Sequence, residues 1–232
     1  MIFRQLFDPA QSAMTYLIGD PVSGEAVVID PLKYQATLIL ALLAEHRLRL
    51  KYVLRTHVHR PDRTDCGDLC PHTGAIFVVG AHNAPDIPGA RVGGGDVLNF
   101  GSESIAVIET PGHTPGCVTY FWRDRIFCGD ALELGGCGQA VDETNAGAMY
   151  DSVRNRIFSL PGDTLIYPGH DYTGRTVSTV AEERQRNTDF SGLSRDRFIE
   201  HLERVEKRPV LRDHHSPRPF EQDLEPLPLE RK

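Results

Sequence analysis

The chain has 232 residues, of which 40% are hydrophobic and 25% are charged, a composition typical of a folded protein with enough residues to bury a large core. Its net charge of −7 provides no basic surface for nucleic acid or for an anionic membrane, so we predict neither as a partner. No apolar run approaches the roughly 20 residues that span a bilayer.

The five cysteines are an odd number, which argues against a disulfide framework and favours buried thiols in a reducing compartment. The first residues lack the long apolar stretch of a signal peptide. Together these features predict a cytoplasmic protein.

Strands and helices alternate along the chain, as hydrophobic periodicity and turn residues indicate. In chain order we expect strands at 13–18 and 25–29 joined as a hairpin, a helix at 34–48, strands at 51–54 and 75–79, a loop at 80–95, strands at 104–108, 118–122 and 125–127, a helix at 149–160, a strand at 164–167, and helices at 176–185 and 195–207.

This order suits two mixed β-sheets packed between helices, an α/β fold. We expect one catalytic domain over residues 1–187. Residues 188–232 would add a C-terminal helix and a tail rich in proline and charge, which composition predicts to be extended or partly disordered.

Four short motifs carry candidate metal ligands, and each lies on a loop directly after an expected strand. Strand ends are rigid, so they can direct side chains from distant parts of a sequence toward one point. The motifs are Thr56-His57-Val58-His59, Thr110-Pro111-Gly112-His113-Thr114, Cys128-Gly129-Asp130-Ala131 and Tyr167-Pro168-Gly169-His170-Asp171.

His57, His113 and Asp130 form a set of two imidazoles and one carboxylate, which suits Fe(II), Mn(II) or Zn(II) and leaves coordination positions open. His59 is either a fourth ligand or a neighbouring hydrogen-bonding group. Gly112 and Gly129 would each allow the tight turn that presents the following ligand.

The first motif continues with Arg60, Pro61 and Asp62. A two-metal hydrolase of this pattern would have an aspartate in place of Pro61 and a histidine in place of Asp62. Proline cannot ligate a metal, so the pattern predicts one metal ion per chain. His170 would then orient a ligand or the substrate, Asp62 would lie near the metal without binding it, and Tyr172 would add a hydrogen-bond donor at the rim.

These motifs together resemble the metallo-β-lactamase superfamily. Three longer stretches, at 14–20, 112–120 and 165–183, resemble its persulfide dioxygenase (sulfur dioxygenase) branch, which is related to glyoxalase II. The likeness extends from about Phe3 to Asn187. It implies an αββα sandwich and one non-haem Fe(II) bound by His57, His113 and Asp130, with Zn(II) as the alternative. The implied reaction converts glutathione persulfide and O2 to sulfite and glutathione.

The sequence departs from this family at Pro61 and Asp62, and at Gln139, where the family usually has an arginine. These changes leave the proposed ligands intact but alter their surroundings, so a different thiol persulfide is an open alternative. Arg175 and Gln139 are candidate substrate-binding residues, Arg175 as a cationic partner for a glutathione carboxylate.

Two other functions stay open on the sequence alone. One is a metal-dependent thioester hydrolase of the glyoxalase II kind, and the other is a weakly active or silent relative that retains the fold. The resemblance also makes a homodimer an expectation, since related enzymes are often dimers.

Overall fold

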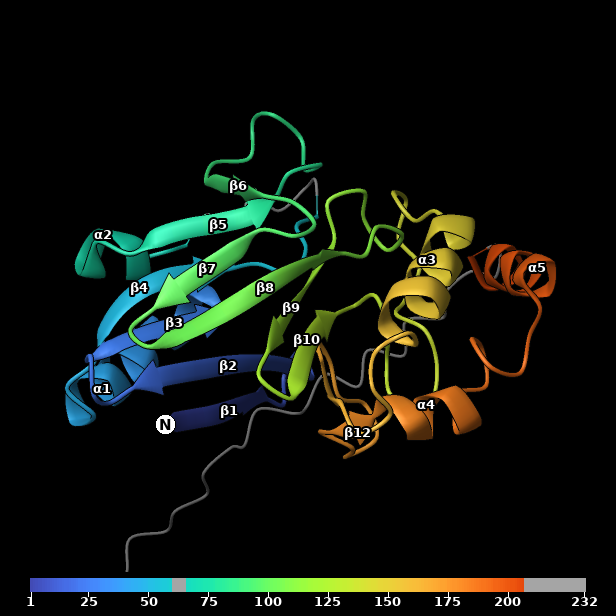
Figure 1. The fold of residues 1–232 in the computed structure, drawn as a ribbon. Helices are drawn as coiled ribbons and strands as arrows, with labels where there is room; N and C mark the ends of the chain where they lie inside the picture. The colour runs from blue at the N-terminus through green and yellow to red at the C-terminus, as the bar shows by residue number, and fades with distance from the viewer. Residues whose placement is uncertain (60–65, 207–232) are drawn as a thin grey trace, which may run out of the picture.

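A computed structural model describes residues 1–59 and 66–206, and Figure 1 shows two β-sheets packed face to face with helices on both outer sides. Sheet A contains six strands that neighbour one another in chain order. They are β1 (Ile2–Asp8), β2 (Ala13–Asp20), β3 (Glu25–Ile29), β4 (Arg49–Leu54), β5 (Ile76–Gly80) and β6 (Ala90–Val92).

Sheet B also contains six strands, in the spatial order β12-β11-β10-β9-β8-β7. They are β7 (Val97–Phe100), β8 (Glu103–Glu109), β9 (Val118–Trp122), β10 (Arg125–Gly129), β11 (Leu165–Pro168) and β12 (Ser178–Thr179). Both sheets are mixed, because β3 to β6 run parallel in sheet A and β10 runs parallel to β11 in sheet B. The carboxyl ends of β3, β4 and β10 therefore lie at one end of the sandwich.

Helices cover the outer faces of both sheets (Figure 1). Sheet A is covered by η1 (Lys33–Gln35), α1 (Ala36–Glu45) and α2 (Leu69–Thr73). Sheet B is covered by α3 (Ala146–Ser152), the π-helix η2 (Val153–Ile157), α4 (Val180–Arg186) and α5 (Arg195–Glu206).

The apolar core has three layers that follow from this arrangement. Between the sheets lie aromatic side chains, among them Tyr16, Phe127 and Tyr167, whose rings are 4.9–5.6 Å apart. A second cluster packs α1 and α2 against sheet A, and a third packs α3, η2, α4 and α5 against sheet B. The two sheets thus share one rigid interior, and the αββα sandwich predicted from the sequence is confirmed.

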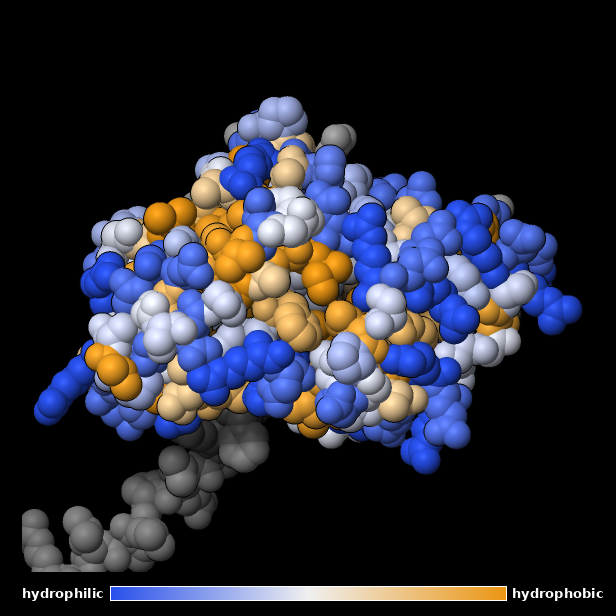
Figure 2. Space-filling model, viewed as in Figure 1, coloured by the Kyte–Doolittle hydropathy of each residue, from blue (hydrophilic) through white to orange (hydrophobic). Residues whose placement is uncertain are grey.

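One part of sheet B lies beyond the helices. Figure 2 shows apolar residues gathered on the outer face of β7 to β9, which the helices in Figure 1 leave uncovered. Val97, Ala106 and Phe121 pair in register across these three strands, and Val97 is 53% exposed.

Most expected elements are present, with shifted ends. The hairpin is confirmed as β2 and β3, and the helix expected at 34–48 ends at Glu45 because Arg47 adopts a left-handed φ of 53°. The helix expected at 176–185 starts only at Val180. Thr179 caps it by accepting a hydrogen bond from the Glu182 N–H, while the residues before it pair with β11.

The prediction that 80–95 is only a loop is wrong, since Ala90–Val92 forms β6 beside β5. Strands β1 and β7 and helix α2 were also not predicted. The pairing of β6 is made by backbone atoms of three residues, so it leaves almost no side-chain periodicity to detect. Strand β1 mixes polar and apolar residues, and none of its side chains is fully buried, so it lacks the alternation that marks a half-buried strand.

The expectation of thiols at all five cysteines is wrong for one pair. Cys66 and Cys70 form a disulfide, while Cys117, Cys128 and Cys137 are free. The turn that leads into α2, in which the Leu69 N–H donates to the Cys66 carbonyl at 3.2 Å, brings the two cysteines to a Cα–Cα distance of 5.7 Å, inside the range that a disulfide requires.

The C-terminal region continues the same packing as far as it is described. Phe198 and Leu202 of α5 are buried in the third cluster, together with Phe190. The predicted tail lies outside the described residues, and the domain boundary at 187 stays a prediction. Among the described helices, none is both long and apolar enough to cross a membrane.

Candidate metal centre

Four side chains from both sheets converge at the carboxyl ends of the strands. His57 and His59 follow β4, Asp130 follows β10, and His113 lies on the loop between β8 and β9. One donor atom from each lies within 4.8 Å of all the others. The structure therefore brings together the three ligands predicted from the sequence and adds His59 to them.

The donor atoms have the separations expected around one ion. The Asp130 Oδ2 atom lies 3.7 Å from His57 Nε2 and 3.6 Å from His113 Nε2, and His113 Nε2 lies 3.4 Å from His59 Nε2. These three separations are shorter than about 4.4 Å, the largest distance between two donors that each bind one metal at about 2.0–2.2 Å. The three imidazole rings are also equidistant, with centroids 4.9–5.0 Å apart and planes near perpendicular.

Burial prepares these groups to bind a cation. It lowers the pKa of His57 and of His113 to about 4, so both imidazoles are neutral at pH 7 and each has a lone pair available. Burial alone would raise the pKa of Asp130, but the surrounding imidazoles outweigh it and hold that pKa well below its usual range. Neutral imidazole nitrogens and a carboxylate oxygen fit Fe(II), Mn(II) or Zn(II).

Hydrogen bonds outside the cluster fix the orientation of two ligands. His113 Nδ1 donates to the backbone carbonyl of Gln139 at 2.9 Å, which leaves Nε2 to face the centre. His170 Nδ1 lies 2.8 Å from Asp130 Oδ1, so the other oxygen of that carboxylate faces the imidazoles. Tyr172 stacks on the His170 ring at 5.7 Å but is 51% exposed.

Two glycines adopt backbone angles that the motif requires. Gly129 has φ 54°, and a Cβ at this residue would lie 2.2 Å from Thr56 Oγ1. Gly112 has φ 151°, and a Cβ there would lie 2.3 Å from Met149 Cα. Only glycine allows the chain to turn so close to its neighbours just before Asp130 and His113.

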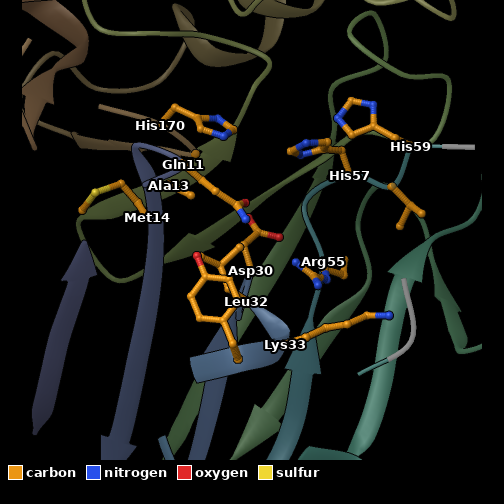
Figure 3. Close-up of a pocket in the computed structure, with 13 residues that line it drawn as sticks. Gln11, Ala13, Met14, Asp30, Leu32, Lys33, Arg55, His57, His59 and His170 are labelled. Carbon is orange, nitrogen blue, oxygen red and sulfur yellow. The ribbon is translucent and has the colours of Figure 1, made fainter. Parts of the chain in front are cut away.

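A cavity of about 570 Å³ opens beside the centre. Figure 3 shows His57, His59 and His170 along one side of it and Lys33 and Arg55 along the other. Gln11 and the exposed Tyr34 also line it, so the cavity places polar and charged groups beside the histidines.

The candidate substrate residues occupy other positions. Arg175 lies 3.2 Å from Glu182 and 3.6 Å from Glu183, and it does not line this cavity. Gln139 contributes its backbone carbonyl to His113, while the residue itself is exposed. Asp62 lies outside the described residues.

Sequence reasoning missed Gln11, Lys33 and Arg55. Gln11 and Lys33 come from the β1–β2 turn and from η1, which precede every motif, and only the fold brings them near the histidines. Arg55 had a usable signal, because it stands immediately before the first motif at the end of β4.

Curated proteins with related sequences share most of the chain. Persulfide dioxygenase ETHE1, mitochondrial, of Homo sapiens is 40% identical over 205 residues, covering 86% of this chain and 79% of the relative. Hydroxyacylglutathione hydrolase of Salmonella dublin is 36% identical over 151 residues, covering 65% of this chain and 59% of the relative. No protein-family model matches the chain.

Solved structures show the same fold. The crystal structure of ETHE1 from Myxococcus xanthus has a TM-score of 0.84 and 42% identity, covering 94% of this chain and 97% of that one. A metallo-β-lactamase from Staphylococcus aureus has a TM-score of 0.80 and 27% identity, covering 90% of this chain and 68% of that one.

Proposed function

The chain belongs to the persulfide dioxygenase family of the metallo-β-lactamase superfamily, and on that basis we propose that it oxidises a thiol persulfide, with glutathione persulfide as the leading candidate. The persulfide, one O2 and one water give the free thiol and sulfurous acid, which ionises to sulfite. The outer sulfur loses four electrons and O2 accepts them, so the reaction needs no other oxidant.

We propose one Fe(II) per chain, bound by His57, His113 and Asp130, with Zn(II) as the alternative. The observation that carries this proposal is the convergence of these donors and His59 within 4.8 Å. Their protonation suits a cation, since the imidazoles of His57 and His113 are neutral and the carboxylate is charged. Two imidazoles with one carboxylate would leave three positions of a six-coordinate ion open, or two if His59 also binds, enough for O2 and a persulfide sulfur.

Bound Fe(II) would supply redox activation of O2 and a binding position for the terminal sulfur. The chain supplies orientation. The Gln139 carbonyl and His170 hold His113 and Asp130 in place, and the cavity beside His57 and His59 admits the organic part of the substrate. Holding the reactants side by side accelerates their reaction by removing the need for a chance encounter.

A thioester hydrolase is the second candidate, favoured by the similarity to hydroxyacylglutathione hydrolase. In that function the residues would hold a metal that activates water, and O2 would not be consumed. A silent relative would bind the metal or not, and would turn over neither substrate.

The test is oxygen uptake after glutathione persulfide is added to anaerobically purified, Fe(II)-loaded protein, with sulfite measured in the same sample and His113→Ala as the control. Stoichiometric sulfite and an inactive variant would support the proposal. No uptake by protein with a full iron complement would overturn it, and hydrolysis of S-lactoylglutathione by that sample would identify the alternative.

Three finer expectations are part of this proposal. The protein acts in the cytoplasm, although the relative from Homo sapiens is named as mitochondrial. It forms a homodimer, and the catalytic domain ends near residue 187. Cell fractionation, sedimentation and limited proteolysis, respectively, would test these expectations.

A further inference from the structure

A series of hydrogen bonds through Asp30 and Thr56 connects the end of β3 to His57. The Asp30 carboxylate follows β3, and its two oxygens lie 2.9 Å from the Thr56 backbone nitrogen and 2.6 Å from Thr56 Oγ1. Thr56 Oγ1 lies 3.0 Å from His57 Nδ1. Thr56 is buried and His57 is half-buried, so solvent has little access to these contacts.

The direction of each hydrogen bond follows from the chemistry of its partners. The Thr56 N–H can only donate. Burial raises the pKa of Asp30, while Arg55 and the two hydrogen bonds from Thr56 favour its charged carboxylate, which can only accept. The Thr56 hydroxyl therefore donates to Asp30, and its lone pair accepts the hydrogen bond from His57. This order puts the proton of His57 on Nδ1 and leaves Nε2 to face Asp130.

The surrounding backbone holds this hydrogen-bonded series in place. Asp30 has a left-handed φ of 50°, and its N–H donates to the Leu54 carbonyl at 2.9 Å, which joins β3 to β4. The missing side chain of Gly129 leaves the space that the Thr56 hydroxyl occupies. The fold thus fixes Asp30 and Thr56, the first two members of this hydrogen-bonded series, without any ligand.

We propose that Asp30 and Thr56 are positioning residues that set the ring orientation and tautomer of His57 and place a negative charge behind this ligand. The inference rests on the proposed function, because it requires His57 to bind the metal. The other two proposed ligands are supported differently, His113 by a neutral carbonyl and Asp130 by an imidazole. His57 is therefore the ligand whose electron donation the protein strengthens through a buried carboxylate.

The test compares Thr56→Val, which removes the hydroxyl at constant volume, with Thr56→Ser, which keeps it. Metal affinity is measured by chelator competition with Co(II), and the visible absorption of the Co(II) protein reports the ligand field. We expect Thr56→Val to weaken Co(II) binding by about 10–100-fold and to shift the absorption bands. Thr56→Ser should stay within about threefold of the wild type and keep the wild-type spectrum.

Thr119→Val is the matched control. The Thr119 hydroxyl makes a buried hydrogen bond of 3.0 Å to Thr110, and it is not part of the series from Asp30 to His57. It should leave Co(II) affinity unchanged. Asp30→Asn, which keeps an acceptor oxygen but removes the charge, should weaken binding by an intermediate amount and replaces Thr56→Val if that variant does not fold.

Two results would overturn the inference, and they are distinguishable. Wild-type Co(II) affinity and spectrum in both Thr56→Val and Asp30→Asn would overturn the positioning role alone, with the proposed function intact. A wild-type chain that binds no metal would overturn both.

Discussion

Two buried aspartates join the sheets at opposite ends of the sandwich, and their surroundings differ. Asp20, at the end of β2, accepts hydrogen bonds from the backbone and side chain of Ser102 in the β7–β8 turn and from the Val22 N–H. Asp130 also lies between the sheets, but its Oδ2 faces two imidazole nitrogens at 3.6–3.7 Å without a hydrogen bond. The protein itself supplies the hydrogen-bond donors for Asp20, so Asp20 has a structural role. Asp130 is arranged for a cation that the protein does not supply, and the difference identifies the functional end of the molecule.

Asp130→Asn should have the largest effect. The variant keeps the shape of the side chain but removes the charge, and its amide would face the imidazoles with N–H groups that they cannot all accept. We expect Fe(II) affinity and oxygen uptake to fall by about 100-fold or more, because loss of a ligand exceeds the usual cost of losing an outer partner. Iron per chain and the initial rate of uptake measure this, and a variant with full iron content would contradict the assignment of Asp130 as a ligand.

Gly129→Ala tests the junction between the two sheets at the functional end. A left-handed φ costs a non-glycine residue about 1–2 kcal/mol, and the added Cβ would also displace Thr56. We expect lower stability together with weaker metal binding. Gly74→Ala has the same backbone cost at φ 70° but no neighbour within 4 Å, so it should lower stability alone. Denaturant unfolding and chelator competition on both variants separate the two effects.

Asp20→Asn is the counterpart at the other end, and it should affect folding without affecting the metal. The N–H groups of Ser102 and Val22 hold the pKa of Asp20 well below its usual range. A lowered pKa stabilises the folded state above the unfolded pKa of about 4, and this contribution is lost as the pH falls below it. The difference in unfolding free energy between wild type and variant should therefore have its largest value at pH 7 and decrease below about pH 4. Weaker Co(II) binding by this variant at pH 7 would contradict the separation of the two ends.

Arg175→Gln should have the smallest effect. This guanidinium already pairs with Glu182 and Glu183 and lies outside the cavity beside the histidines. We expect the KM for glutathione persulfide to change by no more than about twofold, because Arg175 does not line the cavity that would admit the substrate. A tenfold rise in KM would restore Arg175 as a substrate-binding residue.

The central strands of both sheets and the three proposed ligands could be predicted from the sequence because each depends on local signals. His57, His113 and Asp130 each follow an apolar strand, and a strand end has a defined direction. Gln139 shows what such signals omit, since its contribution to His113 comes from a backbone carbonyl that any residue possesses. Lys33 likewise lines the cavity only because the fold brings η1 to the same cavity as His57 and His59, a relation that exists in three dimensions alone.

The proposed ligands come from both sheets, and this has a consequence for how the enzyme matures. His57 follows a strand of sheet A, while Asp130 follows β10 of sheet B, so no fragment that ends before β10 contains the complete centre. Contacts between distant parts of a chain form late in folding. A growing polypeptide would therefore complete the proposed metal site only after both sheets have formed and docked.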